Sequence, residues 1–313
     1  MGVLLLLGGF GLLSLPGLVG RLGRRLPPEE WARLCAGCLG AGAVIVEAAC
    51  VLYALPTVLR AASVPAIAAL CERALHLFLP GGRPAGWAAA AIAITIPGLA
   101  ALGLGRARRC ARTVRAEPSL GSHRALGHHD LVVLPTPQLL AVSLAGTPSQ
   151  IVISDGLVAA LTATQLDLVL RHEAAHLDLD HQRRLEIGAA IDHAFAFWPP
   201  ARRSTQMLRT ALERSADEVA AGDAPEQRRE LRAALLGATA IALNPAEIAA
   251  FSPVETVAER LDALDHDQPK ASMLVRSGLY SAAAANAGLV LVAVAAWGGE
   301  ARMLVAMAGR CST

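Results

Sequence analysis

The chain has 313 residues, of which 54% are hydrophobic and only 17% are charged. With a mean hydropathy of +0.46, this composition argues against an ordinary soluble protein. A net charge of +2 with no concentrated basic stripe gives no support for direct binding of nucleic acid, and six irregularly spaced cysteines exclude a small disulfide framework.

Four apolar runs are long enough to cross a bilayer, and they cover residues 2–20, 34–59, 87–105 and 278–299. The first run is followed, not preceded, by basic residues, which favours an uncleaved anchor over a signal peptide. Residues 62–80 carry charges among apolar positions and are expected to lie at the membrane interface. We therefore expect about four transmembrane helices.

Positive charge in the connections predicts the orientation of these spans. Four arginines lie in residues 21–33, five lie in 106–115, and Lys270 and Arg276 precede the last run. Placing these regions in the cytoplasm orients all four spans consistently. The sequence thus predicts a multi-pass protein of the plasma membrane, with the bilayer as a partner and residues 106–277 in the cytoplasm.

Two features of the second apolar run have more than one interpretation. Glu47 is costly inside a membrane and is a functional candidate, although a neutral or paired carboxyl would also be tolerated there. Cys35 and Cys38 form a C-x-x-C pair that suits a redox or zinc site, or simply two small residues in a membrane helix.

The segment 106–277 has a different pattern. Three short β-prone runs, "LVVLP", "QLLAVSLAG" and "QIVIS", predict a small sheet. Thr162 and Gln165 form a candidate capping box for a helix with an apolar stripe at Leu166, Val169, Leu170 and Leu177. A later helix is expected from about residue 204 to 221, followed by two charged helices that end near residue 265. The predicted fold is mainly α, with an α+β domain.

The stretch "LRHEAAHLDLDH", residues 170–181, contains the H-E-x-x-H pattern. His172 and His176 are four residues apart, so on a helix they share one face and could both bind a zinc ion. Glu173 lies beside the first histidine, where it could act as a general base on water. Catalytic zinc also needs a third protein ligand.

Candidates for the third ligand lie in "ALERSADEVAAG". Glu213 and Asp217 are four residues apart: either they form a solvated charged face, or Glu213 binds zinc while Asp217 orients a ligand histidine. Asp178, Asp180 and His181 are further candidates for the third ligand. For these three residues we rank that role second, and we expect first that they form a solvated helix end.

These residues resemble the BlaR/MecR-type antirepressor metallopeptidases, which are membrane gluzincins. "ATQLDLVLRHEAAHLDLDH" matches the family's zinc helix, "FWPP" stands where the family has a Trp-Phe-Asn-Pro-like element, and "ERSAD" matches its E-x-x-x-D helix. The resemblance implies three N-terminal spans, then an α+β zincin-like protease domain, and then a fourth, C-terminal span. The expected division is therefore a membrane region (1–105), a protease domain (106–277) and a C-terminal span with a short tail (278–313).

Carried over position by position, the resemblance implies Zn²⁺ as the cofactor, with His172, His176 and Glu213 as ligands, Glu173 as the catalytic base and Asp217 as the residue that orients a ligand. It also implies a protein substrate, with a cytoplasmic DNA-binding repressor as the candidate. The chain departs from the family in having no S-x-x-K motif and no large domain after the last apolar run. We therefore do not expect it to sense β-lactams by acylation.

Some parts of the mechanism stay open at this level. His193 and Arg260 are candidate donors to the oxyanion, and the run "QIVIS" is a candidate edge strand for binding substrate backbone. Residues 186–198 either dip into the membrane or form a buried structural helix. Two other functions compete with the antirepressor: HtpX-like quality control of membrane proteins, and a metal-binding signalling scaffold without catalysis.

Overall fold

The computed structural model describes residues 2–64, 68, 82–116, 121–241, 254–265, 273–285 and 288. Within these residues three helices are long and apolar enough to cross a membrane: Val3–Gly23, Pro28–Ala61 and Arg83–Arg109. They coincide with the first three predicted spans and indicate a membrane protein. The predicted interfacial segment and most of the fourth span fall outside the described residues.

The three spans belong to helices α1 (Gly2–Gly23), α2 (Pro28–Ala61) and α4 (Gly82–Ala116). Helices α1 and α2 approach closely at two glycines. A methyl group on Gly9 would lie 2.7 Å from Val46 Cγ2, and one on Gly42 would lie 2.8 Å from the Gly9 carbonyl oxygen. Small residues of this kind let helix backbones pack tightly in a membrane.

The cysteine pair and Glu47 both lie in α2. Cys35 and Cys38 are buried free cysteines, which is compatible with small packing residues in a membrane helix. Among the described residues they belong to no cluster of potential metal ligands. One carboxylate oxygen of Glu47 is buried without a hydrogen-bond partner in the described part of the chain.

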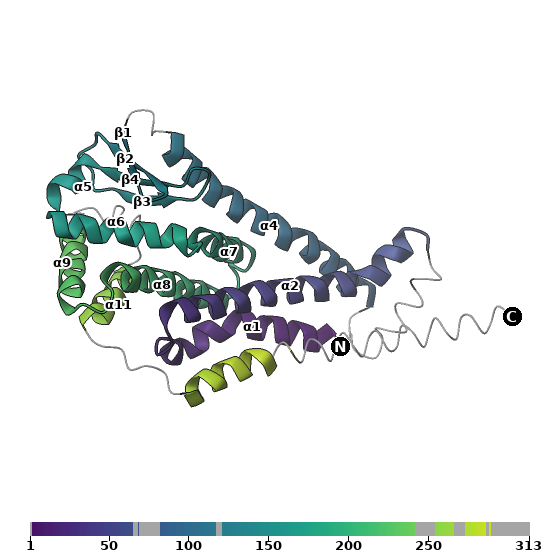
Figure 1. The fold of residues 1–313 in the computed structure, drawn as a ribbon. Helices are drawn as coiled ribbons and strands as arrows, with labels where there is room; N and C mark the ends of the chain where they lie inside the picture. Colours follow the sequence, from purple (N-terminus) through teal and green to yellow (C-terminus); the bar gives the residue numbers. More distant parts are fainter. Residues whose placement is uncertain are drawn as a thin grey trace.

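Four strands form a mixed sheet in the order β1-β2-β4-β3 (Figure 1). They are β1 (Ser122–Leu126), β2 (His129–Leu134), β3 (Ala141–Leu144) and β4 (Gln150–Ser154). Strand β4 pairs in parallel with β2 and antiparallel with β3. The inner strands are rich in Val, Ile and Leu because both faces of the sheet are covered at their positions.

The helix with the H-E-x-x-H pattern, α6 (Ala163–Asp178), packs on one face of the sheet. Its predicted capping box is confirmed, since Gln165 N donates to Thr162 Oγ1 and Thr162 N donates to Gln165 Oε1. The predicted apolar stripe also contacts Ile151, Ile153 and their neighbours. The short α5 (Asp155–Ala160) connects β4 to α6.

In the part of the chain that the structure describes, five helical elements follow α6. They are α7 (His181–Ala194), α8 (Pro199–Ala221), α9 (Pro225–Ile241), α11 (Val254–Asp265) and a helical segment at 273–285. Helix α8 begins five residues before the predicted start near residue 204, because proline is well tolerated in the first turn of a helix. The charged helices predicted to follow and to end near residue 265 correspond, in the described residues, to α9 and α11.

The membrane-type helices and the later helices share one hydrophobic core. Leu13 and Trp31 from α1 and α2 pack in the same cluster as Ile191 of α7 and Leu208 of α8. Figure 1 shows α8 lying along α1 and α2, while α7 lies between α8 and α4. Residues 186–194 lie in α7, and Ile191, Ala194 and Phe195 pack in this cluster, which is compatible with either interpretation of residues 186–198.

Candidate metal centre

The two histidines of the H-E-x-x-H pattern converge from one face of α6. His172 and His176 are both buried, and their Nε2 atoms lie 3.1 Å apart. This arrangement follows from their spacing, because residues four apart on a helix lie one above the other. The predicted pair is therefore brought together as expected.

Glu213 approaches the same point from α8. Its carboxylate oxygens lie 3.6 Å from His172 Nε2 and 3.7 Å from His176 Nε2. The potential ligand atoms of these three residues all lie within 4.8 Å of one another. Two buried imidazoles and one partly buried carboxylate fit the ligand set of a catalytic zinc ion, which keeps its fourth position open.

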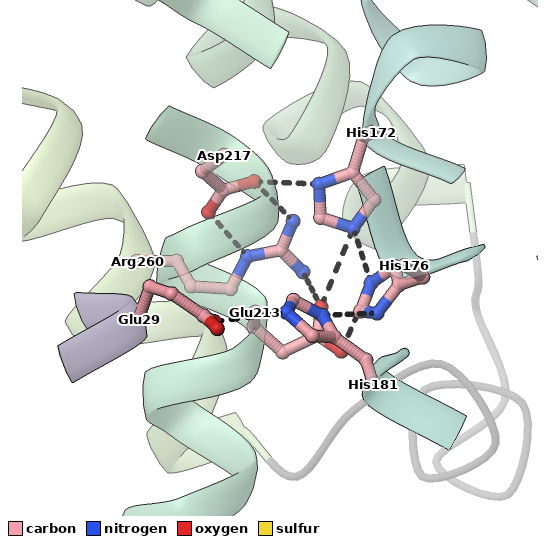
Figure 2. Close-up of polar contacts among 7 residues, drawn as sticks. All are labelled: Glu29, His172, His176, His181, Glu213, Asp217 and Arg260. Carbon is pink, nitrogen blue, oxygen red and sulfur yellow. Dashed lines mark hydrogen bonds and ion pairs between the residues drawn. The ribbon is translucent and has the colours of Figure 1, made fainter. Parts of the chain in front are cut away.

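Asp217 lies one helical turn after Glu213 and faces His172. Its Oδ1 atom is 3.0 Å from His172 Nδ1, on the side of the ring away from Glu213 (Figure 2). A carboxylate in this position fixes the orientation of a ligand imidazole. The structure thus brings Asp217 against His172, one of the two histidines of the predicted ligand set.

Arg260, from α11, joins the two carboxylates. Its Nε and Nη2 atoms donate to Asp217 at 2.8 Å each, and its Nη1 atom lies 2.9 Å from Glu213 Oε2 (Figure 2). The bidentate contact is the strong geometry for a guanidinium and a carboxylate. The sequence suggested Arg260 only as a donor to an oxyanion, so this pairing with Glu213 and Asp217 was missed.

The charges of the centre distribute protons unequally between the two histidines. Burial lowers the pKa of His172, but its contacts with Asp217 and Glu213 outweigh burial and raise this pKa to about 10. Burial lowers the pKa of His176 to about 4. Burial by itself raises the pKa values of Glu213 and Asp217, but the positive charge of Arg260 brings both below their usual range.

Glu173 is partly buried beside the ligands and is not a member of the ligand group. Burial raises the pKa of its carboxyl group above the usual value. The hydroxyl of Ser143, on strand β3, hydrogen-bonds this carboxylate. A carboxyl group with a raised pKa, held by a neighbour but free of the metal, suits proton transfer near neutral pH.

His181 corrects one expectation from the sequence. It is fully buried, whereas a solvated helix end was expected, and its Nδ1 atom lies 3.0 Å from Nδ1 of His176. Its Nε2 atom lies 3.4 Å from Glu29 Oε2, at the start of α2 (Figure 2). Asp178 and Asp180 are exposed, in agreement with a solvated end, and neither belongs to this centre.

The structure also shows where His193, a candidate donor to the oxyanion, and the run "QIVIS", a candidate edge strand, lie relative to the centre. His193 lies at the contact between α7 and α4, where its ring contacts Arg106 and the Ala189 carbonyl, so it does not belong to the centre. The run "QIVIS" is strand β4, an inner strand, so its prediction as an edge strand was wrong. The order of strands arises from pairings between distant segments, which the sequence pattern does not reveal.

The edge strand next to the centre is β3. Ser154 N donates to the Leu140 carbonyl, so Leu140 and Ser154 form a hydrogen-bonded pair between β3 and β4. Along an antiparallel ladder such pairs alternate with pairs that are not hydrogen-bonded to each other. The backbone N–H groups of Ala141 and Ser143 therefore point away from β4. Among the described residues no strand pairs with this side of β3, which leaves these donors available to an extended peptide.

Comparison with known proteins agrees with this geometry. No curated protein and no solved structure matches the chain. Residues 128–240, which include the strands β2 to β4, His172, His176, Glu213 and Asp217, match the family model of Peptidase family M48. The match supports a metallopeptidase of the zincin type, for which a metal ion, typically zinc, is required. Residues 128–240, within a chain that has three candidate membrane helices, are thus similar to Peptidase family M48.

Proposed function

We propose that the protein is a membrane-embedded zinc endopeptidase that hydrolyses peptide bonds of a protein substrate. The observation that carries the proposal is the convergence of His172, His176 and Glu213 on one buried point, with Glu173 beside them. Zinc held by these three residues would supply Lewis-acid activation of a water molecule and of the scissile carbonyl group.

The remaining steps belong to the side chains. The carboxylate of Glu173 takes a proton from the attacking water and passes it to the nitrogen of the leaving amine. Ser143 orients that carboxylate. Asp217 holds the ring of His172, and Arg260 balances the negative charge of Glu213 and Asp217.

Strand β3 is the proposed binding site for the substrate backbone. Its outward N–H groups at Ala141 and Ser143 can donate hydrogen bonds to the carbonyl groups of an extended peptide. Because Ser143 also contacts Glu173, a peptide bound along β3 lies next to the catalytic base. Binding through the backbone gives little selectivity for side chains.

Two substrate classes follow from different observations. The resemblance to BlaR/MecR-type antirepressors supports a cytoplasmic transcriptional repressor, with the catalytic domain in the cytoplasm, and signal transduction as the role. The packing of α7 and α8 against α1, α2 and α4 favours a second candidate, a membrane protein cleaved beside the bilayer in HtpX-like quality control.

Mapping of protein N-termini in cells distinguishes these classes. Cells that express the wild-type chain are compared with cells that express Glu173→Gln at the same level. We expect new N-termini that depend on Glu173, either in a soluble DNA-binding protein or in membrane proteins. Identical sets of N-termini in both strains would favour a metal-binding scaffold and contradict the endopeptidase.

A further inference from the structure

A second group of potential ligands lies where the turn between β1 and β2 meets the end of α6. His128 Nε2 is 3.0 Å and His129 Nε2 is 3.2 Å from the same oxygen, Oδ1 of Asp178. The three potential ligand atoms lie within 4.8 Å of one another. We propose that these residues bind a second divalent transition-metal ion of the zinc type, outside the catalytic centre.

The chemistry of the three groups favours such an ion. Two imidazole nitrogens and one carboxylate oxygen are a donor set that zinc binds readily, while calcium and magnesium prefer oxygen alone. The rings of His128 and His129 have centroids 3.9 Å apart, so two imidazolium rings here would repel each other. One metal ion satisfies both neutral rings and the carboxylate together.

His129 is already oriented for this task. It is buried, and its Nδ1 atom lies 2.6 Å from Ser149 Oγ. A proton on Nδ1 donated to this hydroxyl leaves the lone pair of Nε2 facing Asp178. Ligand histidines in metal sites are commonly fixed in this way through their other nitrogen.

Asp178 adds an electrostatic reason for a bound cation. It is the last residue of α6, where the helix dipole presents negative charge and a carboxylate is unfavourable. A cation between Asp178 and the two histidines offsets both the negative charge of the carboxylate and the negative end of the helix dipole. It would also tie the β1–β2 turn to the helix that carries the catalytic ligands.

This site is separate from the catalytic centre. Asp178 follows His176 by two residues, which turns its side chain by about 200° around the helix. The catalytic ligands His172 and His176 are buried, whereas the side chains of His128 and Asp178 are exposed by 75% and 48%. Solvent therefore reaches the second site, and we expect its zinc to bind about ten- to a hundredfold more weakly than the catalytic zinc.

Zinc titration of the full-length protein tests the proposal. The protein is purified in detergent without a polyhistidine tag, stripped of metal and titrated with Zn²⁺ in a calorimeter. We expect two classes of sites in the wild type. His128→Ala should lose the weaker class and keep both the tight class and the wild-type cleavage rate, and the retained tight class shows that the variant is folded.

The control variant is His123→Ala, because His123 is an exposed histidine on β1 that pairs with Asp130. It should keep both classes. A single class that survives in His128→Ala would overturn the proposal, and so would a weaker class that survives in His128→Ala. Glu213→Gln separates this result from the proposed function: it should remove the tight class alone. A wild type with the weaker class but no tight class would instead contradict the catalytic centre.

Discussion

His172 and His176 occupy neighbouring positions in the metal centre but differ in proton affinity. His172 faces Asp217 and Glu213, which raise its pKa to about 10, while burial lowers the pKa of His176 to about 4. Near neutral pH the two rings of the metal-free centre therefore hold one proton more than two neutral imidazoles would, and His172 carries it. A metal ion must displace this proton before it can bind His172.

Zinc binding should accordingly release one proton at pH 7 to 8. Below the raised pKa of His172, zinc affinity should increase about tenfold for each unit of pH, with no second proton from His176. Calorimetry in buffers of different ionisation enthalpy, on the His128→Ala variant to isolate the catalytic class, measures this number. Two ordinary histidines would release almost no proton at pH 8, and that result would contradict the assignment.

At the scale of single residues, the sequence was sufficient for the local part of the centre. His172, Glu173 and His176 lie within one helical turn or so of each other, and the E-x-x-x-D pair is equally local. The contacts of Arg260 with Asp217 and of Glu29 with His181 join residues 43 and 152 positions apart. No local pattern predicts such pairs, because they depend on how α2 packs against α7 and how α8 packs against α11.

At the scale of elements, the start of α2 reaches the metal centre. Glu29 lies in the first turn of α2 and contacts His181, Arg184 and Ser215. His181 in turn contacts the far nitrogen of His176. A candidate membrane helix is thereby connected, through His181, to a residue of the candidate metal centre.

We expect Glu29→Gln to lower zinc affinity and kcat/KM by about tenfold, since loss of the carboxylate charge weakens the contact that orients the His181 ring. Glu30→Gln is the matched control: Glu30 is the next residue on α2 and contacts Arg276 and Tyr280 instead. Zinc competition with a chelator and cleavage rates are measured for both. Equal losses in the two variants would show a general effect on stability, and unchanged affinity in Glu29→Gln would contradict the orienting contact.

The edge strand β3 supports a second prediction at this scale. Ala141→Pro removes one outward N–H group but leaves the ladder with β4 intact, because Ala141 N points away from β4. KM for a peptide substrate should rise about tenfold while zinc content and Tm stay close to wild type. An unchanged KM would place the substrate elsewhere.

Prediction of elements from the sequence succeeded where the pattern was strong. The zinc helix and its capping box follow from apolar spacing and from Thr162 and Gln165. Strand β1, "SHRAL", was missed because its residues are mostly polar and exposed at the edge of the sheet. Strand order was also inaccessible, so the edge was assigned to β4 instead of β3.

At the scale of the whole molecule, the metallopeptidase helices and the candidate spans pack as one body. Gly17 of α1 contacts the start of α8, where Gly17 N donates to Ser204 Oγ at 2.9 Å. A methyl group on Gly17 would lie 2.9 Å from Arg203 Cβ and 3.1 Å from the Pro200 carbonyl oxygen. The docking of α8 on α1 therefore depends on this glycine.

Gly17→Ala should destabilise the protein by about 1–3 kcal/mol, because the added methyl group overpacks this contact. Gly40→Ala, also in a candidate span, is the control, since a methyl group there meets no atom within 4 Å. Thermal unfolding in detergent compares the two. If Tm falls equally in both variants, α8 does not rest on Gly17 as described.

The most direct test of the whole account measures zinc content and proteolysis on the same purified samples of wild type and Glu173→Gln. The account predicts equal zinc in both and at least a hundredfold loss of cleavage in the variant, roughly the contribution of a general base. Equal zinc with equal cleavage would leave a metal-binding protein without Glu173 as its base. Absence of zinc from the wild type under zinc-replete conditions would contradict the metal centre itself.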